Sequence, residues 1–254
     1  MAFFERYEIK VTSTLDGSSE PSLFYEADTS DGPRPLIVGL HTWSYDRFNQ
    51  EKAMLPYAEK YNYHLLLPEF RGANLASNPR CTQACGSSLA VQDIFDAAEY
   101  VKKNFEVDTD RIYLIGCSGG GHMSLMCAAK NPDYFRAIAS FVPITDLARW
   151  ESENPNYAPS VRVCCIDRGE MRRRSPMSYA ESIAKANLKI FHGKYDHVVS
   201  YKQSVDLFLE IMKIDPASRV FLDIFDGGHE MSMKVAMDWL LKGEDENKLT
   251  KVSG

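Results

Sequence analysis

Short apolar runs recur along the chain, each of a length that suits one β-strand. The run PLIVGL at residues 35–40 is typical of a strand buried on both faces. Two N-terminal strands are predicted at residues 7–14 and 22–27, on either side of the turn-like residues 16–19. Further strands are predicted at residues 64–67, 111–116, 137–142, 188–192 and 220–225.

Helical periodicity fills most of the intervals between these runs. At residues 88–105, Val91, Ile94, Phe95 and Ala98 recur at the spacing of one helix face. Further helices are predicted around residues 56–61, 121–131, 205–212 and 231–241, the last with Val235, Trp239 and Leu240 facing inward. Because strands and helices alternate, the fold class is predicted to be α/β, with a mainly parallel central sheet and helices on both faces.

No internal repeat or linker divides the sequence, so residues 1–254 are predicted to form one domain. Residues 145–177 interrupt the alternation and look irregular, with Pro155, Pro159 and three consecutive arginines at 172–174. Long irregular segments in compact domains are often functional. We therefore predict that this segment is a cap or insertion over the functional site.

Composition and charge exclude several classes of protein. The chain is 44% hydrophobic and 25% charged, which is typical of a globular protein and not of a disordered one. A net charge of −6 argues against nucleic acid as a partner. No apolar run approaches the roughly 20 residues of a membrane span, so no membrane association is expected. The charged start MAFFERYEIK predicts a cytoplasmic protein as the sequence stands, while an exported mature form is compatible if a leader was removed.

The six cysteines do not follow a metal-binding pattern. Cys117 and Cys127 are predicted to be small buried residues, because they lie beside a turn and in a helical pattern. The remaining four, which lie in two irregular stretches, match the spacing of a zinc site poorly. A disulfide involving Cys81 and Cys85, or Cys164 and Cys165, is compatible with export. We expect neither a metal nor an organic cofactor.

The segment Gly116-Cys117-Ser118-Gly119-Gly120 matches G-x-S-x-G between a predicted strand and a predicted helix. A serine on such a tight turn is raised above the edge of the sheet, and its small neighbours allow the backbone to fold back. The start of the helix also favours negative charge that develops during a reaction. Ser118 is therefore the predicted nucleophile.

A serine nucleophile needs a base and an acid that orients the base. Of six histidines, His229 lies in a loop between the last predicted strand and the last helix, at the same edge of the sheet as Ser118. The acid candidates are Asp196, Asp146 and Asp226, which also follow predicted strands. With Asp196 the chain order is Ser…Asp…His, as in α/β-hydrolases, and Asp196 is favoured over Asp146 because of the motif His192-Gly193-Lys194-Tyr195-Asp196 in which it lies.

An oxyanion hole is expected beside the nucleophile. Gly119 supplies one backbone N–H by its position after Ser118, and Trp43, in the loop after the strand at 35–40, is predicted to supply the second. Thr42 stands where a glycine is common, and the Trp43 side chain is alternatively a wall of the acyl pocket.

Six segments of the sequence resemble the catalytic domain of the prolyl oligopeptidase family. They are LLLPEFRGAN, VQDIFDAAEYV, GCSGGGHMSL, SPMSYAESI, ANLKIFHGKYDHVVSYKQS and DGGHE, and the likeness extends from about residue 35 to 241. The resemblance implies an α/β-hydrolase fold with Ser118 as nucleophile, Asp196 as acid and His229 as base. A chain of 254 residues has no room for the β-propeller of the large members. Stand-alone domains of this type resemble carboxylesterases, cinnamoyl and acetyl esterases, and dienelactone hydrolases, of which the last use cysteine at the elbow.

Three functions are compatible with this sequence. We favour an esterase that acts on a small-molecule or carbohydrate ester; the alternatives are a peptidase or amidase, and a hydrolase-fold protein that binds without turnover. Tyr45 and Trp150 are candidates for stacking on a substrate ring, and Arg174, in the arginine cluster, for binding an anionic group. A homo-oligomer is left open.

Overall fold

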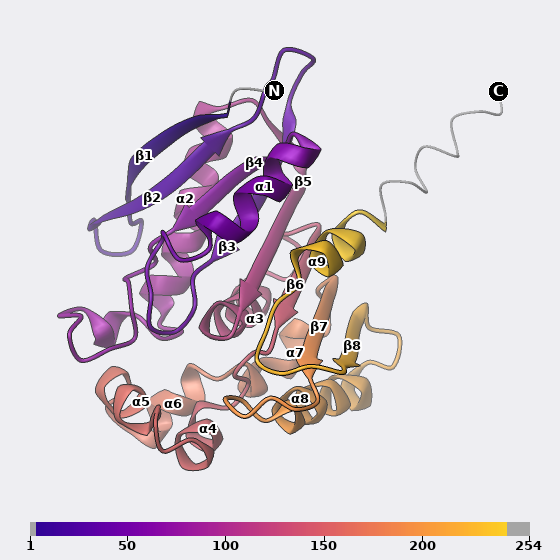
Figure 1. Ribbon diagram of the computed structural model, residues 1–254. Helices are drawn as coiled ribbons and strands as arrows, with labels where there is room; N and C mark the ends of the chain where they lie inside the picture. The colour runs from indigo at the N-terminus through magenta and orange to yellow at the C-terminus, as the bar shows by residue number, and fades with distance from the viewer. Residues whose placement is uncertain (1–3, 243–254) are drawn as a thin grey trace.

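Eight strands form one sheet across residues 4–242, the part of the chain that this computed structural model describes (Figure 1). Their order is β1-β2-β4-β3-β5-β6-β7-β8. β1 and β2 pair antiparallel with each other, β2 pairs antiparallel with β4, and all other pairs are parallel. The strands are β1 Glu5–Thr12, β2 Ser19–Glu26, β3 Arg34–Leu40, β4 His64–Pro68, β5 Val107–Cys117, β6 Ala137–Phe141, β7 Leu188–Gly193 and β8 Val220–Phe225.

Helices cover both faces of this sheet, as the alternating pattern predicts. One face carries α1 (Glu51–Tyr61) and α9 (Met233–Leu240), and the other carries α2 (Ser88–Asn104), α3 (Gly119–Lys130), α7 (Ala180–Ile183) and α8 (Tyr201–Ile214). In β3, Leu36 and Val38 point to the second face while Ile37 points to the first. This alternation buries a continuous apolar strand on both sides. The predicted α/β architecture is confirmed.

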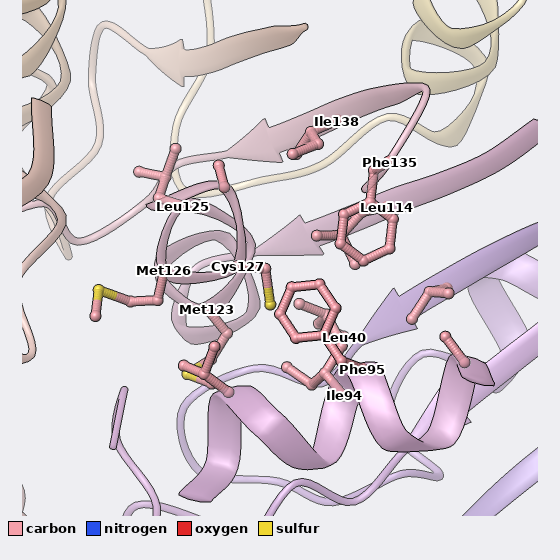
Figure 2. Close-up of a cluster of buried hydrophobic side chains, with 14 of the residues drawn as sticks. Leu40, Ile94, Phe95, Leu114, Met123, Leu125, Met126, Cys127, Phe135 and Ile138 are labelled. Carbon is pink, nitrogen blue, oxygen red and sulfur yellow. The ribbon is translucent and has the colours of Figure 1, made fainter. Parts of the chain in front are cut away.

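The core between α2, α3 and the sheet fixes the position of the central strand-to-helix turn (Figure 2). Ile94 and Phe95 of α2 pack with Met123 and Cys127 of α3 and with Leu114 of β5. Truncating one such buried side chain typically costs about 2–5 kcal/mol of stability. The start of α3, directly after β5, is therefore held rigidly.

The segment predicted to be irregular, residues 145–177, is in fact largely helical. It contains α4 (Leu147–Glu153), α5 (Ala158–Cys164), α6 (Arg168–Arg173) and a 3₁₀ turn at Pro176–Tyr179. Asp146 and Asp167 cap α4 and α6 by accepting hydrogen bonds from the N–H groups of Arg149 and Glu170. Helices of six or seven residues are too short to show a clear apolar period, which is why the sequence pattern missed them. Figure 1 places α4, α5 and α6 together beyond the ends of β5 and β6.

Two further details concern side-chain burial. In the last helix, Leu240 is buried and Trp239 packs against the core as predicted, whereas Val235 is 39% exposed, and Met233, Ala236 and Met237 are the other buried residues. The helix starts at Met233 after Ser232 caps it, so the inward face is shifted from the predicted one.

Cys117 and Cys127 are buried as predicted, and all six cysteines carry free thiols. Within residues 4–242, no helix has the length and apolar character needed to cross a membrane.

Candidate active site

Ser118 occupies the turn between β5 and α3 with φ 58° and ψ −117°, in the left-handed region that a serine rarely adopts. Its N–H donates to Phe141 O at 2.9 Å, and its own carbonyl accepts from the His122 N–H at 2.8 Å. A side chain at Gly116 would overlap the carbonyl of Gly120, so the tight turn needs glycine there. This is the raised serine that the G-x-S-x-G spacing predicts.

His229 joins Ser118 to Asp196 in one chain of hydrogen bonds. The Ser118 hydroxyl lies 2.8 Å from His229 Nε2, and His229 Nδ1 lies 2.7 Å from Asp196 Oδ2. Asp196 follows β7, and His229 lies between β8 and α9. The three predicted residues therefore meet at the carboxyl ends of β5, β7 and β8, in the geometry of a nucleophile, a base and an orienting acid.

The surroundings of Asp196 keep its side chain ionised. Its Oδ1 accepts hydrogen bonds from the N–H groups of Val198 at 2.8 Å and Val199 at 2.9 Å. Burial alone would raise the pKa of this carboxyl, but hydrogen bonds from His192 and His229 outweigh burial and hold the pKa well below its usual range. A carboxylate of this kind stabilises a positive imidazolium on His229.

Trp43 and Gly119 meet where an oxyanion hole is expected. A Cβ placed on Gly119 would lie only 2.5 Å from the backbone nitrogen of Trp43, so these two stretches of backbone run side by side next to Ser118. The Trp43 side chain points away from this place: its Nε1 donates to Ser160 Oγ at 2.9 Å, and its ring meets Trp150 edge-on at 4.8 Å. The indole is thus buried, and the backbone amide is the group available to bind a negative oxygen.

The rival acids occupy other positions. Asp146 caps α4 through the Arg149 N–H, and Asp226 is exposed, whereas Asp196 holds the hydrogen bond to His229 Nδ1. Of the other histidines, His41, His64, His122 and His192 are buried and bonded to main-chain carbonyls, and His197 is exposed. Among the hydrogen bonds of residues 4–242, none of these five side chains contacts the Ser118 hydroxyl, which bonds His229.

Two of the three predicted substrate-binding residues are buried in the protein, where a substrate cannot contact them. Trp150 is 1% exposed and donates its Nε1–H to Val198 O, so it is a core residue behind Trp43. Arg174 is 7% exposed, and its guanidinium donates to the carbonyls of Thr82 and Ala84, so it is unavailable to an anionic ligand. The sequence could not show this, because tertiary contacts decide where a tryptophan or arginine points. Tyr45 is 58% exposed and stays a prediction.

His192 is a site residue that the sequence prediction missed. It is fully buried at the end of β7, and its Nε2 lies 3.2 Å from Asp196 Oδ2 and 2.9 Å from Val199 O, while the Ser204 hydroxyl donates to Nδ1 at 2.7 Å. The available signal was the spacing of four residues between His192 and Asp196 in FHGKYD. In the described part of the chain, no group of three or more His, Cys, Asp or Glu side chains is arranged to hold a metal ion.

The order of the strands, the elbow after β5 and the three residues at the strand ends define an α/β-hydrolase. The prolyl oligopeptidase family matches this sequence over residues 87–242, which is more than half of the chain. The chain belongs to that family, which is a family of serine hydrolases.

Curated relatives include both esterases and peptidases. An S-formylglutathione hydrolase of Rattus norvegicus is 46% identical over 46 residues, covering 18% of this chain and 16% of that protein. Acylamino-acid-releasing enzyme 2 of Oryza sativa subsp. japonica is 28% identical over 204 residues, covering 75% of this chain and 25% of that protein. The matches therefore span a quarter or less of these relatives' own length.

Among solved structures, acetyl xylan esterase 1 from Thermoanaerobacterium sp. JW/SL YS485 superposes with a TM-score of 0.72 at 20% identity. The superposition covers 95% of this chain and 84% of that one. At this level of identity the likeness concerns the fold.

Proposed function

We propose that this serine hydrolase is a carboxylesterase that cleaves small acyl or carbohydrate esters through an acyl-enzyme on Ser118. The observation that carries the proposal is the unbroken chain of hydrogen bonds from the Ser118 hydroxyl through His229 to Asp196, at 2.8 and 2.7 Å. Such a chain lets a serine hydroxyl, which is a weak nucleophile alone, lose its proton as it attacks a carbonyl.

In the proposed reaction, His229 Nε2 takes the proton from Ser118 Oγ as that oxygen attacks the ester carbonyl. The N–H groups of Gly119 and Trp43 bind the resulting oxyanion, and Asp196 stabilises the imidazolium. His229 then gives its proton to the departing alcohol. Water, deprotonated by His229, releases the acid from Ser118 in the second half of the cycle.

Esterases among the relatives and the solved structures support an ester substrate: an S-formylglutathione hydrolase is 46% identical over 46 residues, and acetyl xylan esterase 1 superposes along 95% of this chain. A peptidase or amidase is the second candidate, because the match to acylamino-acid-releasing enzyme 2 covers 75% of this chain.

We place the alcohol part of the substrate in a groove of about 600 Å³ that Ser44, next to Trp43, helps to line. One wall comes from Ser44, the residue after Trp43, together with Leu75 and Ala76, and the other comes from α5 and the residues before it, including Tyr157 and Val163. The mixture of small, apolar and hydroxyl-bearing side chains suits a phenolic ring or a sugar. In this proposal α5, within the predicted cap, helps to select the substrate.

Turnover of 4-nitrophenyl acetate and of an aminoacyl 4-nitroanilide, each with Ser118→Ala as control, tests the proposal. Ester turnover that depends on Ser118, with anilide turnover far slower, is the expected result. Comparable rates on the anilide would favour the peptidase. Equal background rates in wild type and Ser118→Ala on both substrates would favour a protein that binds without turnover.

A further inference from the structure

Four of the six cysteines meet outside the catalytic centre, and we call Cys81, Cys85, Cys164 and Cys165 the cysteine cluster. Cys81 begins the 3₁₀ turn η1 (Cys81–Gln83) and Cys85 follows shortly after it, while Cys164 ends α5 and Cys165 comes next. The turn η1 packs against α5, so segments about 80 residues apart in the sequence lie side by side.

Within the cysteine cluster, Cys85 faces Cys165. Their sulfur atoms are 3.9 Å apart, and both residues are almost completely buried. They share an apolar cluster with Trp43 and Trp150, which links this place to the loop that carries the oxyanion hole. A small change of side-chain rotamer brings two sulfur atoms at this distance to the length of a disulfide bond, about 2.05 Å.

We propose that Cys85 and Cys165 are a redox pair, which a disulfide oxidant such as oxidised glutathione converts to a disulfide that joins the η1 loop to α5. The thiolate of Cys165 attacks one sulfur of oxidised glutathione and releases one reduced glutathione. The Cys85 thiolate then attacks the mixed disulfide at Cys165 and releases the second. The two thiols lose two electrons and two protons in total, and one glutathione disulfide becomes two thiols.

The charges around the pair assign these roles. A hydrogen bond from the Cys85 thiol, aided by the positive charge of Arg174, holds the pKa of Cys165 below its usual range, although burial opposes it. Burial raises the pKa of Cys85. Arg174 is fixed at this place by its hydrogen bonds to the carbonyls of Thr82 and Ala84 in the η1 loop. Cys165 is therefore the attacking thiol.

The oxidant reaches the pair when the helical segment opens. α5 and α6 have only seven and six residues, and helices this short depend on tertiary contacts for their stability. Release of α5 from η1 exposes both thiols without unfolding the sheet. Once formed, the disulfide opposes that release and closes a long loop of the unfolded chain, so it raises thermal stability.

The test compares the full chain after equilibration with oxidised or with reduced glutathione. A non-reducing peptide map of the oxidised sample should contain the Cys85 peptide joined to the Cys165 peptide. The melting temperature should rise by roughly 5–10 °C on oxidation. This rise should vanish in Cys85→Ala and in Cys165→Ala, and persist in Cys81→Ala and in Cys127→Ala, a buried cysteine outside the cluster.

The melting temperature of each oxidised variant is compared with that of the same variant in reduced form, so a lower stability of the variant itself does not affect the difference. Where a variant does not fold, the peptide map of the wild type alone decides. The proposal is overturned if six free thiols remain after oxidation, or if glutathione stays attached to Cys165. It is equally overturned if the map shows Cys81 joined to Cys164 without the Cys85–Cys165 pair, or if the thiols are held by a co-purified metal.

Discussion

His192 Nε2 lies 3.2 Å from Oδ2 of Asp196, the same oxygen that bonds His229 Nδ1 at 2.7 Å. The His192 ring is held at both nitrogens, because Nδ1 bonds the Ser204 hydroxyl and Nε2 bonds the Val199 carbonyl. The buried imidazole therefore holds the same carboxylate oxygen that bonds the base, and we regard His192 as a positioning residue.

Replacing His192 by glutamine should lower kcat by roughly tenfold to a hundredfold, which corresponds to the loss of one hydrogen bond to a charged group. KM should change little, because His192 does not touch the substrate. The hydrogen bond from His192 lowers the pKa of Asp196, so its loss should raise that pKa and strengthen the hydrogen bond that the carboxylate accepts from His229. Because protonation of the base sets the acid limb of the kcat profile, that limb should move to higher pH. His197→Gln, at an exposed position nearby, is the matched control. A fall in kcat with an unmoved acid limb would point to a purely structural role.

Asp196 should also make folding stability depend on pH. Its pKa is lower in the folded protein than in the unfolded chain, so its contribution is present above about pH 4 and is lost as the pH falls through the folded pKa. Urea unfolding of wild type and Asp196→Asn at pH 7 and at progressively lower pH measures this. The difference in free energy of unfolding between the two should shrink in acid. A difference independent of pH would show that the carboxylate is not stabilised by folding.

Gly119→Ala should impair catalysis through the oxyanion hole. The added methyl group would lie 2.5 Å from the Trp43 nitrogen and push the two backbone amides apart. Since one oxyanion-hole hydrogen bond is worth about 10²–10³ in kcat, we expect a loss of that order. Circular dichroism and the melting temperature check that the variant is folded. A folded variant with kcat within threefold of wild type would remove this pair of amides from the mechanism.

Filling the groove beside α5 should change substrate choice without harming the chemistry. Ala76 is exposed and lines the groove, so Ala76→Trp can enter it without disturbing the core. For esters of a bulky phenol or sugar, KM should rise roughly tenfold, while kcat/KM for the acetate of a small alcohol should be unaffected. Ala217→Trp, at an exposed position in the turn before β8, is the control. Equal effects on large and small esters would place the alcohol elsewhere.

Much of this fold and of the triad could be predicted from the sequence, because the end of each short apolar run marks the end of a strand. Ser118, Asp196 and His229 each follow an apolar run, and the carboxyl ends of parallel strands meet at one edge of a sheet. The three short helices at 147–173 could not be predicted, because each has fewer than two turns.

Side-chain direction was the other limit of sequence-based prediction. Trp150 and Arg174 have the chemistry of binding residues, yet Val198, Thr82 and Ala84 take up their hydrogen-bonding groups. The contact between His192 and Asp196 depends on the turn after β7. Tertiary contacts decide all of these directions, and the local pattern of apolar residues carries no information on them.

Trapping the acyl-enzyme tests the central claim most directly. Wild type mixed with 4-nitrophenyl acetate should release a burst of nitrophenol equal to the enzyme concentration, and rapid acid quenching followed by peptide mapping should find the acetyl group on Ser118. Ser118→Ala should lose both the burst and steady turnover, by on the order of 10⁴-fold or more. An acetyl group on a different residue, or turnover that survives in Ser118→Ala, would contradict the account.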